Sequence, residues 1–158
     1  MKEHDAYDRY AIHFATLDED GEVCATVSLI YNSSIGYPTE NSTKFDNSMF
    51  DREKLGEMSR IFVDKKYRSM KTTKVIIEAV KRYMYIKMMQ EGIEYTYGHL
   101  EKSFLRLLKI YKMPYHPVGP IYKDENIGLR YPCILYTKEL GIENSRLIKL
   151  WERSREIQ

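Results

Sequence analysis

The chain has 158 residues, of which 43% are hydrophobic, and its formal net charge is +2. This length predicts a single domain over residues 1–158 with a core of its own. No run of 18 or more apolar residues occurs, which argues against a membrane-spanning helix, and the polar residues 1–5 argue against a signal peptide. A near-neutral charge without a recognisable motif argues against a nucleic-acid-binding protein.

The first elements are expected to be strands. Residues 10–17 and 22–31 alternate in polarity around the Gly-containing turn at 18–21, which predicts a β-hairpin. Residues 32–54 are a long polar stretch, expected to be a mobile or functional loop. Residues 57–63 then predict a buried strand.

A helix follows, because residues 72–90 change to a 3.6-residue period and end before Gly92. A strand at 93–100, a short helix at 103–111, strands at 118–122 and 131–137, and an amphipathic helix at 143–157 complete the chain. This order predicts an α/β (α+β) fold in which a mixed central sheet is flanked by helices. The helix between strands 57–63 and 93–100 implies a right-handed parallel crossover.

Cysteine and histidine usage indicates no metal site. Cys24 and Cys133 are far apart in sequence, and we expect both thiols to be buried in strands of a cytoplasmic protein. The four histidines lack the spacing of metal ligands. They are His4, His13, His99 and His116.

The segment after strand 57–63 has the composition of an anion site. A polar loop that opens a helix presents unpaired N–H groups, and Arg68 and Lys71 lie beside it, so a phosphate is a suitable ligand. Basic residues continue from Lys65 to Lys87. They fit either a solvated helix face or a surface that binds an acidic protein.

Charged residues within or near the strands are candidates for function. Glu57 and Arg60 lie in an otherwise apolar strand, where a charge needs a partner or a cleft. Their spacing of three predicts opposite faces, so each is expected to have its own partner; the alternative is a strand-end charge in water. Asp5 and Asp8 could bind an amine or simply add surface charge.

Several motifs resemble those of acyl-homoserine-lactone synthases. Residues 57–64, Glu-Met-Ser-Arg-Ile-Phe-Val-Asp, resemble their Glu-x-Ser-Arg-Phe-x-Val-Asp signature, and residues 5–8 resemble their Asp-x-x-Asp element. Residues 105–120 are similar to their closing helix and following strand, and residues 128–132 resemble the related N-acyl amino acid synthases. The resemblance runs from about Asp5 to Leu140. It implies the GNAT-type acyl-CoA N-acyltransferase fold.

The resemblance also implies an activity. Such an enzyme moves a fatty acyl group from acyl carrier protein to the amine of an amino acid or a similar small acceptor. No cofactor would be permanently bound; acyl-phosphopantetheine or acyl-CoA would be the co-substrate. The acidic acyl carrier protein would dock by charge on the basic helix start, and loop 32–54 would cover the acyl chain.

The same resemblance assigns roles to residues. Glu57 would be the general base, Arg60 would orient its surroundings or hold an acceptor carboxylate, and Tyr111 would protonate the leaving thiolate. Acceptor binding falls on Asp5, Asp8 and Ser59. Donor binding, through backbone amides or side chains, falls on Ile61, Phe62, Val63, Arg68, Ser69, Lys71, Thr72 and Thr73.

Departures from the family pattern keep alternatives open. Residues 27–29 lack an arginine of the lactone synthases, which argues against S-adenosylmethionine as acceptor, and the segment before Asp5 lacks their covering helices. Lys71 and Thr73 replace small residues of the coenzyme A pyrophosphate loop. The first alternative is nevertheless a coenzyme A-dependent N-acetyltransferase. The second is an inactive domain that binds an acyl chain or a partner through helix 143–157, which is also a candidate surface for pairing with a second copy.

Overall fold

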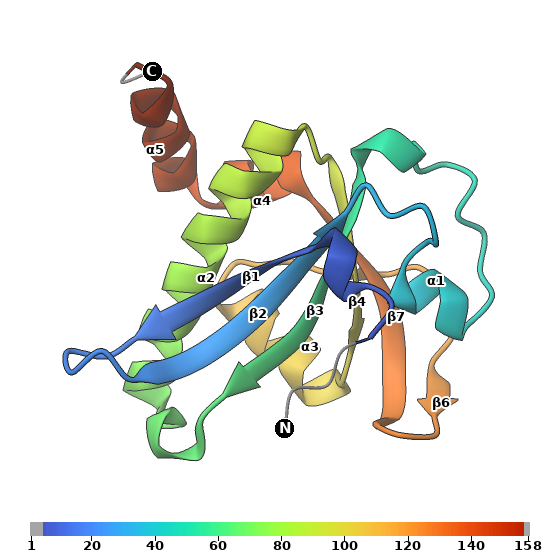
Figure 1. Cartoon of the computed structure of the whole chain (residues 1–158), viewed down its shortest axis with the longest axis horizontal. Helices are drawn as coiled ribbons and strands as arrows, with labels where there is room; N and C mark the ends of the chain where they lie inside the picture. Colours follow the sequence, from blue (N-terminus) through green and yellow to red (C-terminus); the bar gives the residue numbers. More distant parts are fainter. Residues whose placement is uncertain (1–4, 157–158) are drawn as a thin grey trace.

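A computed structural model describes residues 5–156, which form a mixed sheet with helices packed against it (Figure 1). The strands are β1 (Ala11–Leu17), β2 (Val23–Tyr31), β3 (Leu55–Val63), β4 (Tyr95–Leu100), β5 (His116–Pro117), β6 (Tyr122–Asp124) and β7 (Gly128–Tyr136). The helices are α1 (Pro38–Ser42), α2 (Met70–Glu91), α3 (Lys102–Ile110), α4 (Thr137–Glu143) and α5 (Ser145–Glu156). Short 3₁₀ turns are η1 (Asp8–Tyr10), η2 (Arg52–Lys54) and η3 (Lys65–Tyr67).

The strands pair in the order β1-β2-β3-β4-β7-β5, and β6 pairs with β7. β3 and β4 are parallel, whereas the other paired strands are antiparallel. The parallel pair is joined by α2, as the sequence predicts. The mixed α/β class is therefore confirmed, and the described residues include no helix that is both long and apolar enough to cross a membrane.

Alternating side chains supply the two faces of the sheet. Leu29, Met58 and Leu135 belong to a core cluster that includes residues of α2, α3 and α5. Their neighbours Ile30 and Ile134 belong to a second cluster, which contains Tyr37 and Phe50 from the segment that holds α1. We call these the α2 face and the α1 face.

Most predicted elements are present. The first hairpin forms, and α2 ends at Gly92, whose φ of 68° is the left-handed conformation expected of a glycine cap. Both cysteines are buried in strands, Cys24 in β2 and Cys133 in β7. The polar stretch 32–54 is not a plain loop, because it contains α1 and η2.

Near the end of the chain one prediction is wrong and one helix was not predicted. The strand predicted at 118–122 is replaced by the short strands β5 and β6, because Pro117 and Pro120 cannot donate backbone hydrogen bonds to a ladder. The helix predicted at 143–157 is present as α5, whereas α4 was not predicted. The two helices meet at Asn144, whose side-chain amide donates to the carbonyls of Leu140 and Lys112 (both 2.8 Å). Ile157 lies outside the described residues.

Helix α5 projects from one side of the molecule beside α2 (Figure 1). Leu147 is 5% exposed and packs into the core, with Ile148 and Trp151 against the same cluster. The apolar face of α5 thus packs mainly against the core of its own chain.

Candidate active site

Strands β3 and β4 stop pairing partway along their length. They pair through Leu55–Tyr95, Gly56–Thr96 and Glu57–Tyr97, and no further pair follows in the described chain, although β3 continues to Val63 and β4 to Leu100. Residues 58–63 and 98–100 therefore have edges that face each other without a ladder. We call this the β3–β4 divergence.

A β-bulge in β3 accompanies the divergence. The β2–β3 register changes between Thr26–Phe62 and Ser28–Ser59, so β3 has one extra residue there, and Arg60 has a φ of 53°. A bulge bends a strand and raises its twist, which separates β3 from β4. No glycine marks this position, so sequence reasoning could not locate the bulge.

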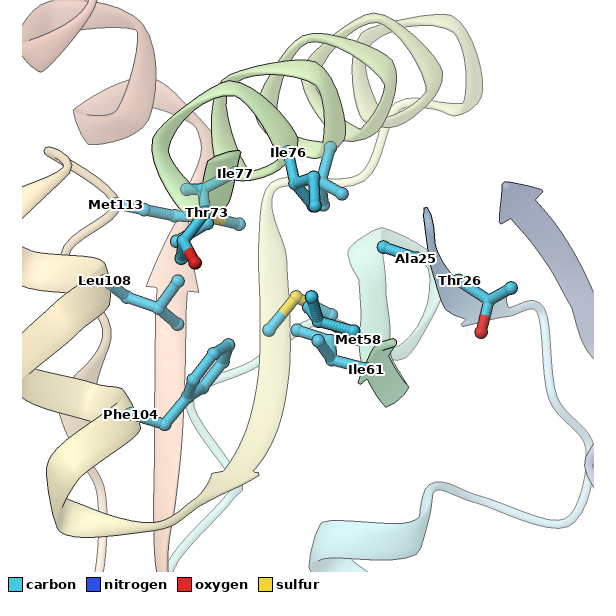
Figure 2. Close-up of a pocket in the computed structure, with 12 residues that line it drawn as sticks. Ala25, Thr26, Met58, Ile61, Thr73, Ile76, Ile77, Phe104, Leu108 and Met113 are labelled. Carbon is cyan, nitrogen blue, oxygen red and sulfur yellow. The ribbon is translucent and has the colours of Figure 1, made fainter. Parts of the chain in front are cut away.

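An apolar cavity of about 30 Å³ lies beside the divergence on the α2 face. In Figure 2 its wall is formed by Met58 and Ile61 from β3, Ile76 and Ile77 from α2, and Phe104 from α3. Such a volume holds about one small group. A longer acyl chain could enter only if flexible side chains such as Met58 moved.

Tyr115 spans the divergence on the same face. A Cβ added to Gly98 of β4 would lie 3.1 Å from its ring, and its hydroxyl donates to the sulfur of Met58 in β3 (3.6 Å). The glycine thus leaves room for the ring. Burial raises the pKa of Tyr115 well above its ordinary value, so the phenol stays protonated.

Glu57 lies on the α1 face with no exposed surface. Its carboxylate accepts hydrogen bonds from the backbone N–H (2.9 Å) and the hydroxyl (2.8 Å) of Thr39 in α1. Burial raises its pKa to about 8, although the Thr39 bonds oppose the shift and the charge of Glu40 adds to it. Glu57 is therefore a partnered buried acid, and not a strand-end charge in water.

The segment around α1 is fastened over Glu57. Tyr37 donates its hydroxyl to the carbonyl of Leu55 (2.8 Å), and Arg52 binds both carboxylate oxygens of Glu40 (2.5 and 2.6 Å). Phe50 is buried against Tyr97. The segment 32–54 therefore covers the α1 face. The cavity, whose apolar lining suits an acyl chain, lies on the opposite face of the sheet.

Arg60 corrects the expectation about opposite faces. It lines a shallow pocket together with Ser59, Ser28 and both predicted acids, on the same face as Glu57. The extra residue of the bulge breaks the two-residue alternation on which the expectation rested. Arg60 Nη1 lies 2.9 Å from Asp8 Oδ1, and Nη2 contacts Asp5 Oδ2, so the expectation of separate partners is met.

The predicted donor loop has the expected strand–loop–helix form. Ser69 caps α2 by accepting a hydrogen bond from the N–H of Thr72 (3.2 Å), and Arg68 donates Nε–H to the carbonyl of Val63 (2.9 Å). Arg68 and Lys71 are exposed. Thr73 instead lines the apolar cavity.

The basic stretch is not one uniform surface. Lys66 is bound to Glu22 (2.7 Å). Lys81 is only 2% exposed and donates to Glu78, the carbonyl of Tyr111 and Asn144. Tyr111 itself is half-buried at the end of α3. The exposed part of the stretch is therefore concentrated near the start of α2, at Lys65, Lys71 and Lys74.

Sequence reasoning passed over three residues near the site. Thr39 and Tyr115 contact the site only through tertiary packing, for which the sequence holds no local signal. His99 had a signal, because it continues the alternation of Tyr95 and Tyr97 onto the α1 face of β4. Between residues 5 and 156, no cluster of three or more His, Cys, Asp or Glu side chains could bind a metal.

Comparison with known proteins agrees with this fold. The acetyltransferase (GNAT) domain family matches residues 2–78. The structure resembles BjaI, a CoA-dependent acyl-homoserine lactone synthase solved with SAM and isopentyl-CoA, at 17% identity and a TM-score of 0.66, covering 92% of this chain and 69% of BjaI. It also resembles apo TofI (17% identity, TM-score 0.58, covering 89% and 77%).

A third similar structure is the spermidine/spermine N-acetyltransferase SpeG from Vibrio cholerae, at 11% identity and a TM-score of 0.59, covering 87% of this chain and 74% of SpeG. No curated protein matches the chain significantly in sequence. The sequence match over residues 2–78 and the shared architecture together show a GNAT-type acyltransferase fold.

Proposed function

We propose that the chain transfers an acyl group from a phosphopantetheine thioester to the amine of an amino acid or similar small acceptor. The observation that carries this proposal is the β3–β4 divergence, with an apolar cavity on one face and a buried carboxylate on the other. A thioester held between the strands would have its acyl group beside the cavity. Its carbonyl carbon would be open to an amine from the α1 face.

The donor would use the backbone of β3 and the start of α2. Amides of Ile61, Phe62 and Val63 lie where β3 has left β4 and would stabilise the oxygen of the thioester as negative charge develops. Arg68 and the amides of residues 69–73 would bind the phosphate at the N-terminus of a helix. Lys71 would add charge.

Proton transfer would use Glu57. Because its pKa is about 8, the carboxyl group can gain or lose a proton near physiological pH. Because the carboxylate is fully buried beneath Thr39, the proton of the amine must reach it through an intermediate group. Tyr111 remains the proposed acid for the leaving thiolate.

The acceptor would lie near Ser59, Arg60 and the two acids. An acceptor carboxylate has to displace Asp5 or Asp8 from Arg60, whereas an ammonium group can approach those acids directly. The pocket therefore favours acceptors that bind through their amine and not through a carboxylate.

The donor we favour is acyl carrier protein, because Lys65, Lys71 and Lys74 are exposed near the start of α2 and suit an acidic partner. A second candidate is an acyl-CoA, favoured by the likeness to BjaI, which is CoA-dependent. Free-thiol release from octanoyl carrier protein and from acetyl-CoA, each with a panel of amines, separates the two. Faster release from acetyl-CoA would reject the carrier protein as donor.

The same assay tests the activity itself. Release no faster than the uncatalysed rate with either donor would reject acyl transfer, and retained binding of carrier protein would then indicate a binding domain. For the proposal to hold, the mass of the acceptor must increase by one acyl group, attached at its amine.

A further inference from the structure

His99 lies on the far side of the β3–β4 divergence from Ser59 and Arg60. It is two residues beyond Tyr97, the last residue of β4 that pairs with β3, and it points to the α1 face like Tyr95 and Tyr97. His99 is half-buried, so part of the residue remains exposed. Glu57, on the same face, has no exposed surface at all.

Tyr122 of β6 fixes the ring of His99. Its hydroxyl lies 3.1 Å from His99 Nδ1. Burial, followed by the charge of Glu57, raises the pKa of Tyr122 to about 12, although the Ser42 hydroxyl at the end of α1 opposes this shift. Tyr122 therefore stays protonated.

Burial favours the neutral form of the His99 ring by lowering its pKa below the ordinary value. Asp124 of β6 opposes this shift, and Arg130 of β7, paired with Glu101, adds to it. No described residue forms a hydrogen bond with Nε2. If Nδ1–H donates to the Tyr122 oxygen, Nε2 has a free lone pair.

We propose that His99, positioned by Tyr122, is the group that first accepts the proton of the acceptor amine. This inference rests on the proposed acyl transfer and supplies the intermediate group that the burial of Glu57 requires. The divergence then has two sides with distinct tasks: Ser59 and Arg60 bind the acceptor, and His99 activates it.

The proposed step balances as follows. Nε2 takes one proton from the ammonium group of the acceptor, and the freed nitrogen lone pair forms a bond to the thioester carbon. The carbon–sulfur bond breaks with its electron pair on sulfur, and the thiolate takes up a proton. The sum is ammonium plus thioester giving amide, thiol and one proton: His99 passes the first ammonium proton to solvent or Glu57, and the second leaves the nitrogen after attack and is taken up by the thiolate.

The test compares His99→Gln with His116→Gln, a matched change at an exposed histidine that pairs with Glu139 at the edge strand β5. The pH dependence of kcat/KM for thiol release is measured with the better of octanoyl carrier protein and acetyl-CoA. We expect His99→Gln to lower kcat/KM on the order of a hundredfold and to remove the acidic limb of the profile. Donor affinity and the His116→Gln profile should match the parent.

A second readout needs no turnover. ¹⁵N NMR of the parent should show the His99 ring neutral at pH values where an ordinary histidine is half protonated, about 6.5, with Nδ1 carrying the proton. Tyr122→Phe should disturb this tautomer, and spermidine or L-phenylalanine should shift the Nε2 resonance.

Parent-like rates and pH profile in His99→Gln would overturn the inference and leave the proposed function intact. An Nε2 resonance whose chemical shift does not change when either amine is added would overturn it as well. Absence of thiol release in the parent would reject the proposed function itself, and the inference with it.

Discussion

Glu57 shows how a single residue can be predicted by type but not by environment. An acid inside an apolar strand indicates a partner, and the partner is Thr39, 18 residues earlier in the chain. Only tertiary packing brings the two together, so no local pattern could name Thr39. The consequence is a carboxyl group whose pKa is raised to about 8 by burial.

Changing Glu57 to Gln should remove most turnover while donor binding persists. The side chain keeps its shape but loses the ability to accept a proton, which should cost on the order of a hundredfold in rate. Thiol release and equilibrium binding of the donor measure the two effects. Glu94→Gln, at an exposed acid paired with Lys54, is the matched control. Parent-like turnover in a folded Glu57→Gln protein would make Glu57 structural.

The same substitution predicts a change in how stability depends on pH. The folded-state pKa of Glu57, about 8, exceeds the ordinary 4.5, so between these values the folded protein holds a proton that the unfolded chain has released. The free energy of unfolding should therefore fall as pH rises through this window. Gln cannot titrate, so the melting temperature of Glu57→Gln relative to that of the parent should rise from pH 5 to pH 9. A constant difference would show that Glu57 is ionised when folded.

Among the elements, those with strong local signals were predictable and those set by packing were not. The period of α2 and its Gly92 cap were readable, as was the turn between β1 and β2. The bulge at Arg60 has no such signal, yet it moves this side chain to the face of Glu57 and separates β3 from β4. Helix α1 was missed because a proline and four polar residues show no apolar period, and contacts such as Thr39 with Glu57 hold it.

The start of α2 should bind the donor in two ways that salt can separate. Arg68→Ala should weaken donor affinity about tenfold or more even at high salt, because a close charged hydrogen bond is lost. Lys65→Glu and Lys74→Glu should slow association mainly at low salt, since exposed charges are screened. Calorimetry at two salt concentrations measures both.

Lys66 is unsuitable for that series because its reversal would also repel Glu22. Equal losses at all three tested positions that vanish at high salt would mean that no phosphate site exists at this helix.

At the scale of the whole molecule, the sheet separates two environments. The α2 face supplies the apolar cavity, and the α1 face supplies Glu57, Arg60 and His99. The order of elements predicted the mixed sheet and the parallel crossover, because hydrophobic periodicity determines both. The place where β3 and β4 part depends on one extra residue and on side chains such as Tyr115, and only the structure locates it.

The central claim is that the β3–β4 divergence receives the acyl donor. Hydrogen–deuterium exchange with and without S-acetonyl-CoA, or a carrier protein with the same stable thioether, tests it most directly. We predict slower amide exchange in residues 58–63 and 98–100 when the analogue is bound, with β1 unchanged. Protection confined to the surface around Lys65 and Lys74, with exchange at the divergence unaltered, would contradict the claim.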